Sequence, residues 1–423
     1  MAFGPSFAPL ANPVFDPPHP FWLNESLITT NPMHTPVQLP LDESALQEAE
    51  SLLAVGQPPH RALATLRKQR DATTAAWAWE MAQVRNHARA KGWTGMLFTR
   101  EALEQATRQE LAIHRAKRFA SHGPVIELGA ACGADTIQLA RVTTGVAVEW
   151  DPLRARYLAA NLKHHRLQHR MLAIRADAQR FPAAHFACGF ADPARRQEGK
   201  RLLDLDAYSP SLTSLLANLP GPCAIKLAPA QQPGELFALP GGNHFSLEWV
   251  GWLGELKELV LWRQLPLPGR RVATVFPTGA SLAWADPTPP PWPQPKPLGN
   301  FLFDPHPAIT RAGLVGLLAN QIEAAPIDTQ IAFLTADQPV QTPFARCLGV
   351  LAHFPFSLKN ARDAIRQHQA GPVEIIKRGS AVDAADLQKS LKSQGDTPAS
   401  LILTRVGDRP VGILARAVSF PSA

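Results

Sequence analysis

The sequence has little cysteine and no long apolar run. Only four of its 423 residues are cysteine, and none stands in CxxC or another metal-ligand spacing. This pattern favours a reducing compartment and argues against structural zinc. No window approaches the length needed to span a bilayer, and the N-terminus lacks a basic stretch followed by a continuous apolar segment. We therefore expect a cytoplasmic protein that has no membrane segment and binds no metal.

Basic residues are absent from the first 60 positions, which carry six acidic residues. They are concentrated in residues 61–118, with twelve basic and five acidic residues, and in residues 154–201, with eleven and three. Two basic regions that flank a site would suit a phosphate backbone, which indicates RNA as a partner. The other interpretation is a solvated arginine-rich surface, because long helical stretches often expose such charges.

Residues 124–152 are the most informative part of the chain. Val125–Leu128 is an apolar run suited to a buried strand, and residues 129–133 form a loop with almost no side-chain bulk. A helix and a second apolar strand follow, and this strand ends in Glu149 and Asp151. A carboxylate placed there can accept hydrogen bonds from both hydroxyls of a ribose. The layout predicts a nucleoside-binding βαβ unit.

The loop distinguishes between two classes of cofactor. Dinucleotide sites use GxGxxG, whereas this loop has only Gly129 and Gly133. The acidic Glu127 precedes the loop, where it would repel a pyrophosphate and attract the amino group of a methionine moiety. S-adenosylmethionine is therefore the predicted ligand. A packed βαβ crossover without a ligand is the alternative.

Acidic residues also follow the next two predicted strands. The third strand-like run ends at Asp177, and the fourth, Phe186–Ala191, is followed by Asp192 and Pro193. Ligands of open parallel sheets bind beyond the carboxyl ends of the strands. We therefore expect these residues to lie at one edge of the sheet, together with Gly129 and Glu149.

The chain divides into five predicted parts. They are a proline-rich arm (1–40), a helical domain (41–118), a sheet domain with the candidate site (119–285), a proline-rich linker (286–299) and a C-terminal unit (300–423). Within the sheet domain, three later apolar runs would complete seven strands with a terminal antiparallel hairpin: Cys223–Leu227, Leu259–Trp262 and Arg271–Phe276.

Several segments carry a family resemblance. In order they are LEQAT (103–107), HRAKRF (114–119), ELGAACGADT, VAVEWDP, ADPARR with SPSL, AIKLAP, VEIIKRG and LILTRVGDRPVGILAR. Over roughly residues 98–423 the chain resembles the bacterial class I S-adenosylmethionine-dependent methyltransferases that carry a C-terminal THUMP-like domain. The family usually has glycine where this chain has Ala131, and often aspartate where it has Glu127 and Glu149.

This resemblance implies an α/β fold with a Rossmann-like seven-strand class I methyltransferase sheet. A helical N-terminal domain precedes the sheet, and a small α+β THUMP-like domain follows it. The resemblance also implies S-adenosyl-L-methionine as the cofactor and an RNA-facing role for the C-terminal domain. Methylation of an exocyclic or ring nitrogen of a base is the reaction we expect.

The loop after the fourth strand bears on the acceptor. Methyltransferases that act on exocyclic amines have Asp or Asn, Pro, Pro and an aromatic residue there. Asp192 and Pro193 keep the first half of this motif, whereas Ala194 and Arg195 replace the second. Asp192 can receive an amine hydrogen, and an arginine plane could replace the aromatic ring. The competing interpretation of Asp192 is a loop cap tied to Arg195 or Arg196. Lys226 is expected to be exposed or salt-bridged, or else to face the site.

The candidate residues fall into three groups. The catalytic candidates are Asp192 and Pro193. The cofactor-binding candidates are Glu127, Gly129, Ala131, Gly133, Glu149, Asp151 and Asp177. The candidates for RNA contact are Arg195, Arg196, Arg378 and Arg405, although the last two could instead pair with local carboxylates. Two other functions stay open: a non-catalytic RNA-binding protein on a methyltransferase scaffold, and a methyltransferase acting on a protein or a small molecule.

Overall fold

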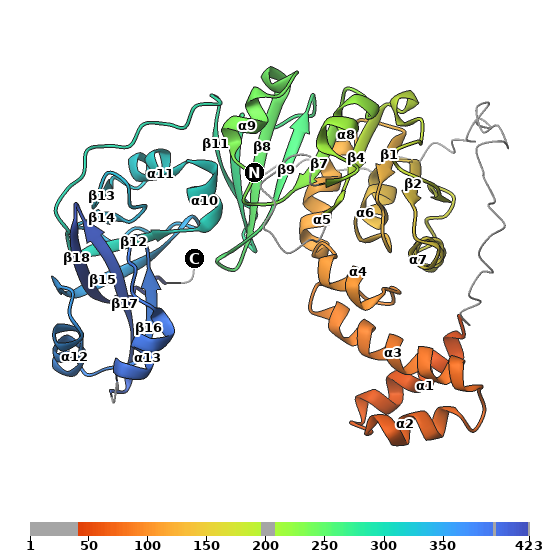
Figure 1. The fold of residues 1–423 in the computed structure, drawn as a ribbon, viewed down its shortest axis with the longest axis horizontal. Helices are drawn as coiled ribbons and strands as arrows, with labels where there is room; N and C mark the ends of the chain where they lie inside the picture. Colours follow the sequence, from red (N-terminus) through yellow and green to blue (C-terminus); the bar gives the residue numbers. More distant parts are fainter. Residues whose placement is uncertain (1–40, 196–207, 392–394, 422–423) are drawn as a thin grey trace, which may run out of the picture. The chain divides into compact units, whose positions relative to one another are not determined.

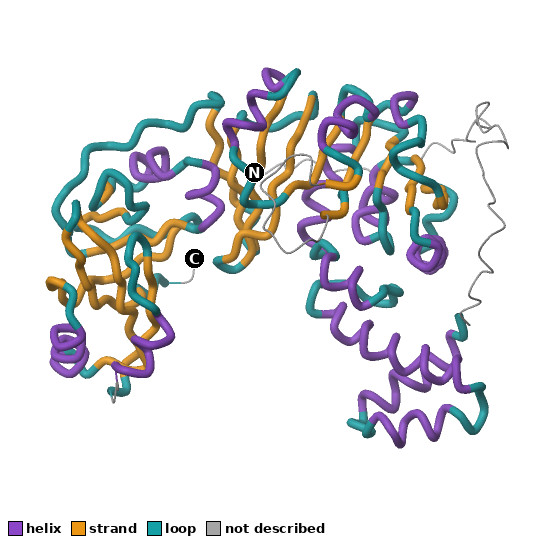
Figure 2. The backbone as a smooth tube through the Cα atoms, viewed as in Figure 1, coloured by secondary structure: helices purple, strands orange, loops and turns teal. Residues whose placement is uncertain are grey.

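A computed structural model describes residues 41–195, 208–391 and 395–421, so the predicted arm (1–40) and Arg196 lie outside the described residues. The N-terminal part of the described chain is helical, as expected (Figure 2). Asp42, Asp71 and Thr99 cap the starts of three helices by accepting backbone N–H groups, which compensates for the unpaired amides of a first helical turn. The helices are α1 (Glu43–Ala54), α2 (Pro59–Leu66), α3 (Ala72–Arg89), α4 (Arg100–Gln105) and α5 (Gln109–Ala116).

A nine-stranded sheet follows, in the order β11-β10-β8-β9-β7-β4-β1-β2-β3 (Figure 1). Its strands are β1 (Val125–Leu128), β2 (Gly145–Glu149), β3 (Met171–Arg175), β4 (Cys188–Ala191), β7 (Cys223–Leu227), β8 (Phe245–Trp252), β9 (Glu255–Arg263), β10 (Arg271–Phe276) and β11 (Ala280–Trp284). β1, β2, β3, β4 and β7 are parallel, and β9 is antiparallel to both of its neighbours, β7 and β8. β8 therefore runs in the same direction as β7, and its end lies at the same edge of the sheet.

The sheet has two strands more than the seven expected. The unpredicted strands are β8 and β11. β8 forms an antiparallel hairpin with β9, and β10 forms the terminal antiparallel hairpin with β11. β10 lies parallel to β8. The apolar run of β8 is interrupted by Glu248, which is fully buried. The partners that make this burial possible come from distant parts of the chain, so the local pattern gave no sign of them.

Helices connect the parallel strands. α6 (Ala134–Val142) joins β1 to β2, and α7 (Pro152–His164) joins β2 to β3 (Figure 1). Shorter helices, α8 (Leu212–Asn218) and α9 (Pro233–Ala238), follow β6 (Tyr208–Ser209) and β7. β6 pairs with β5 (Ala194–Arg195) in a small ribbon outside the main sheet.

The C-terminal part contains a second sheet of seven strands, in the order β13-β14-β12-β15-β18-β17-β16. Its pairings are antiparallel except that of β16 with β17. The apolar runs 373–376 and 401–404 lie within β16 and β17. The strands are β12 (Phe301–Pro305), β13 (Ala325–Pro326), β14 (Leu334–Ala336), β15 (Ala345–Pro355), β16 (Ala370–Lys377), β17 (Thr397–Val406) and β18 (Arg409–Ala417), and the helices are α10 (Pro307–Ala312), α11 (Val315–Gln321), α12 (Leu358–Gln367) and α13 (Ala384–Leu391).

Candidate active site and cofactor site

The loop between β1 and α6 has a backbone that favours glycine. Gly129 and Gly133 have φ angles of +82° and +92°, and Ala131 has a φ of +48°. A Cβ atom on Gly129 would lie 2.8 Å from the carbonyl oxygen of Asp192, so glycine lets the ends of β1 and β4 approach each other. The left-handed conformation of Ala131 explains why glycine suits this position, since a side chain there costs roughly 1 kcal/mol.

Glu127 lies beneath this loop and is only 1% exposed. Its Oε2 atom is buried without a hydrogen-bond partner among the described residues, and so is the Oγ1 atom of Thr136. Burial first, and then the charge of Asp135, raises the pKa of Glu127 well above its usual value. A buried carboxylate oxygen with no partner fits a cationic donor such as an ammonium group. The residues present therefore fit the predicted cofactor.

Glu149 connects the end of β2 to the loop. One of its carboxylate oxygens accepts the backbone N–H of Ala131, and the other accepts that of Asp151, both at 2.8 Å. Each oxygen keeps a second lone pair that a ribose hydroxyl could use. The loop and the acidic strand end are thus held in one fixed arrangement.

Two other predicted cofactor residues have local partners. Asp151 is the N-cap of α7 and accepts the backbone N–H groups of Leu153 and Arg154 at 3.0 and 2.8 Å. Asp177 lies two residues beyond β3 and accepts the N–H of Gln179 at 2.9 Å. The Asp177 side chain is partly exposed, whereas the single capping oxygen of Asp151 already makes two hydrogen bonds.

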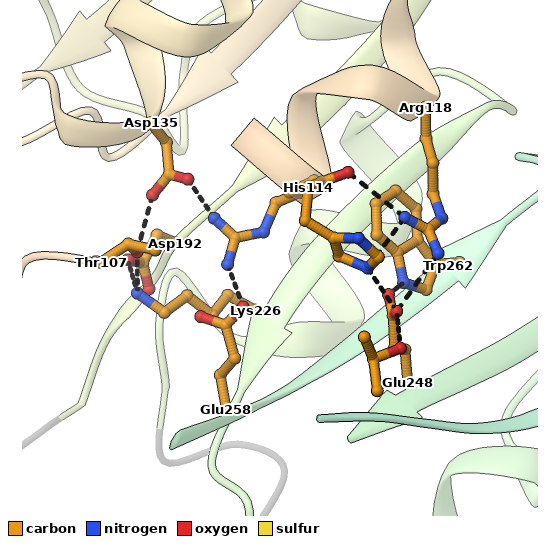
Figure 3. A network of polar contacts seen from close by, with 11 residues as sticks. Thr107, His114, Arg118, Asp135, Asp192, Lys226, Glu248, Glu258 and Trp262 are labelled. Carbon is orange, nitrogen blue, oxygen red and sulfur yellow. Dashed lines mark hydrogen bonds and ion pairs between the residues drawn. The ribbon is translucent and has the colours of Figure 1, made fainter. Parts of the chain in front are cut away.

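Asp192 is paired with Lys226, which the sequence alone left as exposed, salt-bridged or facing the site. The Nζ atom of Lys226 donates to Oδ2 of Asp192 at 2.7 Å and to Oγ1 of Thr107 at 3.0 Å (Figure 3). Burial favours the neutral amine, but Asp192 and two further carboxylates outweigh it and raise the pKa of Lys226. Lys226 is thus both salt-bridged and directed at the candidate catalytic residue.

Behind this pair lies a buried ionic network that the sequence pattern did not reveal. Thr107 donates to Asp135 at 2.9 Å, and the Arg115 guanidinium donates to Asp135 and to Glu258 (Figure 3). Arg115 is 2% exposed, and its pKa is raised because the two carboxylates outweigh its burial. Thr107 belongs to LEQAT and Arg115 to HRAKRF, so two segments that carried the family resemblance meet at the candidate site.

Asn161 of α7 is a second residue that the sequence pattern did not reveal. Its Nδ2 donates to the carbonyl oxygen of Cys132 at 2.7 Å and to that of Leu97 at 2.9 Å, and its Oδ1 accepts the N–H of Leu97 at 2.8 Å. The side chain is completely buried. Asn161 therefore fixes the glycine loop to the segment before α4.

The remaining candidates differ in their surroundings. Pro193 is buried, and Arg195 forms the ribbon with Tyr208. In the C-terminal part, Arg378 donates to the carbonyl oxygens of Ala332 and Pro305 and forms an ion pair with Asp304 at 2.8 Å. Arg378 thus pairs with a local carboxylate, which was the alternative to RNA contact.

Arg405 lies on β17 and donates to the carbonyl oxygen of Gly407 at 2.8 Å and to Oε1 of Gln330 at 2.7 Å. No carboxylate accepts these two bonds. Among the described residues, no group of three or more His, Cys, Asp or Glu is placed to hold a metal ion. No helix in the described part of the chain is long and apolar enough to cross a membrane.

The chain is similar to known proteins in sequence and in fold. Residues 345–417 match the family model described as THUMP domain-like. The chain is 30% identical over 365 residues to an uncharacterized S-adenosylmethionine-dependent methyltransferase of Mycobacterium tuberculosis, found in two strains, over 82% of this chain and 98% of the relative. A methyltransferase candidate of Porphyromonas gingivalis W83 has a similar solved structure, with a TM-score of 0.71, 17% identity and coverage of 89% of this chain and 99% of that one. The latter likeness concerns the fold alone.

Proposed function

This chain belongs to the S-adenosylmethionine-dependent methyltransferases, and we propose that its acceptor is RNA. The expected fold class, cofactor and enzyme class are thereby confirmed. The THUMP-like match at residues 345–417 is the observation that favours RNA. The excess of basic residues in 61–118 and 154–201 supports it, because a phosphate backbone is bound by clustered Lys and Arg.

The cofactor supplies an electrophilic methyl group when it is bound. We assign Glu127 to its ammonium group, because the buried Oε2 has no other partner among the described residues. Glu149 would accept the ribose hydroxyls from the position that Ala131 and Asp151 impose on it. Asp177, partly exposed beyond β3, would accept the adenine amine. Asp151 would act through α7 rather than by touching the cofactor.

Asp192 would hold the amine of the acceptor base. Its pairing with Lys226 at 2.7 Å fixes the position of the carboxylate, and the charge-assisted contact leaves the other carboxylate oxygen available to accept a further hydrogen bond. By accepting an N–H of the amine, Asp192 would orient the nitrogen lone pair toward the methyl group for an in-line displacement. Asp192 or solvent would take the amine proton, and the bound cofactor would supply the methyl group and keep the electron pair of the broken S–C bond. Pro193 would keep the loop stiff.

Two experiments test the proposal in sequence. Calorimetric titration with S-adenosylmethionine and S-adenosylhomocysteine measures cofactor binding without any acceptor. A tritiated-methyl screen then compares total RNA with total protein and a small-molecule extract. Label in RNA supports the proposal. Label only in protein or small molecules would refute it, and cofactor and RNA binding without transfer would favour the non-catalytic scaffold.

A further inference from the structure

An aromatic stack stands at the edge of the sheet to which Asp192 belongs. Trp252 and Phe276 are the last residues of β8 and β10, which are parallel to each other. Their rings are stacked, with centroids 6.2 Å apart and planes inclined by 18°. The guanidinium carbon of Arg108 lies 4.0 Å from the centroid of the Trp252 ring. Arg108 therefore makes a cation–π contact with the Trp252 ring, which is itself stacked on Phe276.

The chain connects this stack directly to the candidate catalytic pair. Arg108 follows Thr107, which accepts a hydrogen bond from Lys226, and Lys226 donates to Asp192. The Nε atom of Arg108 is buried and has no hydrogen-bond partner among the described residues. Its nearest acidic group is Glu110, at 3.8 Å. The guanidinium is thus held by the Trp252 ring more than by any carboxylate.

The surroundings of the stack are cationic and partly apolar. Lys91 has its pKa lowered to about 8, first by burial and then by the charges of Lys226, Lys257 and Arg108. These cations repel one another, although Glu255 pairs with Lys257 and Glu110 lies 3.8 Å from Arg108. A phosphate group bound here would relieve the remaining repulsion. In the turn after Trp252, Leu253 is 69% exposed. Cationic groups beside planar groups are the combination that single-stranded nucleic acids bind.

We infer that Arg108, in cation–π contact with Trp252, is a stacking surface for a nucleobase of single-stranded RNA. It would replace the aromatic residue that the loop Asp192-Pro193-Ala194-Arg195 lacks. Bases stack on guanidinium planes as well as on aromatic rings. Phe276 and Trp252 would keep the plane of Arg108 fixed, and Thr107 would fix its place relative to Asp192. The inference rests on RNA as the acceptor class.

A binding experiment separates stacking from charge. Fluorescence anisotropy at fixed ionic strength would compare a labelled 12-nucleotide oligoadenosine RNA with a 12-unit abasic ribose-phosphate strand. Arg108→Lys keeps the charge and removes the plane. Arg100→Lys is the matched control, since Arg100 lies on α4, is 57% exposed and pairs only with Glu80 among the described residues.

We expect Arg108→Lys to weaken binding of the oligoadenosine strand roughly tenfold and to leave abasic binding and the salt dependence unchanged. Arg100→Lys should bind both strands as the wild type does. The inference is overturned if Arg108→Lys binds oligoadenosine like the wild type, or loses both strands equally. Failure of the RNA assignment looks different, since the wild type itself would then bind neither strand.

Discussion

The substitution Glu127→Gln tests the cofactor site with the smallest change in shape. Glutamine keeps the volume of the side chain and removes the negative charge from a group that is 1% exposed. A cofactor ammonium would then lose its buried, charge-assisted partner. Removal of one partner from such a pair costs about 2–5 kcal/mol, which corresponds to a roughly 30-fold to several-thousandfold rise in Kd.

The same substitution should stabilise the free protein. Burial raises the pKa of Glu127 in the folded state, so the group favours folding only below its ordinary pKa and costs stability as the pH rises above it. Glutamine does not titrate and escapes this cost. The stability of the Glu127→Gln variant relative to the wild type should therefore increase as the pH rises from the ordinary pKa of glutamate to the raised pKa of Glu127, and thermal unfolding across that range measures it.

Calorimetry with two ligands measures the effect. S-adenosylhomocysteine carries the ammonium group, whereas 5′-methylthioadenosine lacks the whole amino-acid portion and serves as the control ligand. Glu127→Gln should lose affinity for the first and bind the second like the wild type. Unchanged affinity for S-adenosylhomocysteine, or an equal loss of both ligands, would refute the assignment of Glu127 to the ammonium group.

Three further substitutions test the buried contacts. Burial would raise the pKa of Glu248, but the hydrogen bond from His114 and the charge of Arg118 outweigh it and lower the pKa to about 2. The resulting stabilisation of about 3 kcal/mol is complete above about pH 4.5 and is lost as the pH falls toward 2. Glu248→Gln should therefore reduce the dependence of the free energy of unfolding on pH over that range, as acid unfolding would show. Asn161→Leu removes three buried hydrogen bonds. It should lower the free energy of unfolding by about 3 kcal/mol, measured by denaturant titration, and weaken cofactor binding, measured by calorimetry. Lys226→Met should reduce kcat roughly a hundredfold and spare S-adenosylhomocysteine affinity, with Lys257→Met as the control in the methyl-transfer assay; full activity of Lys226→Met would contradict the role of its pairing with Asp192.

The part of the candidate site that comes from one continuous segment could be predicted from the sequence. The strand, the glycine loop and the acidic end at Glu149 lie within 25 residues, and their order predicts both the βαβ unit and a nucleoside ligand. Asp151 shows that one residue can fit two local patterns. The same Asp-Pro pair that ends the acidic segment is a good start for a helix, and the structure uses Asp151 as the N-cap of α7.

Contacts between residues far apart in the sequence could not be predicted from local sequence patterns. Arg115 lies 143 residues before its partner Glu258, and His114 lies 134 residues before Glu248. A single sequence does not show which residues pair over such distances. The buried Glu248 therefore hid β8, although most residues of this strand are apolar. The available signal was the family resemblance of LEQAT and HRAKRF, because these two segments supply Thr107, His114 and Arg115.

We propose that this methyltransferase modifies RNA through Asp192. The most direct test of this proposal is tritiated-methyl transfer to total RNA by the wild type and by Asp192→Asn, with S-adenosylhomocysteine affinity measured for both. We expect label in RNA for the wild type, little label for Asp192→Asn, and equal affinities of the two proteins for S-adenosylhomocysteine. Full RNA labelling by Asp192→Asn, or wild-type label confined to protein, would contradict it.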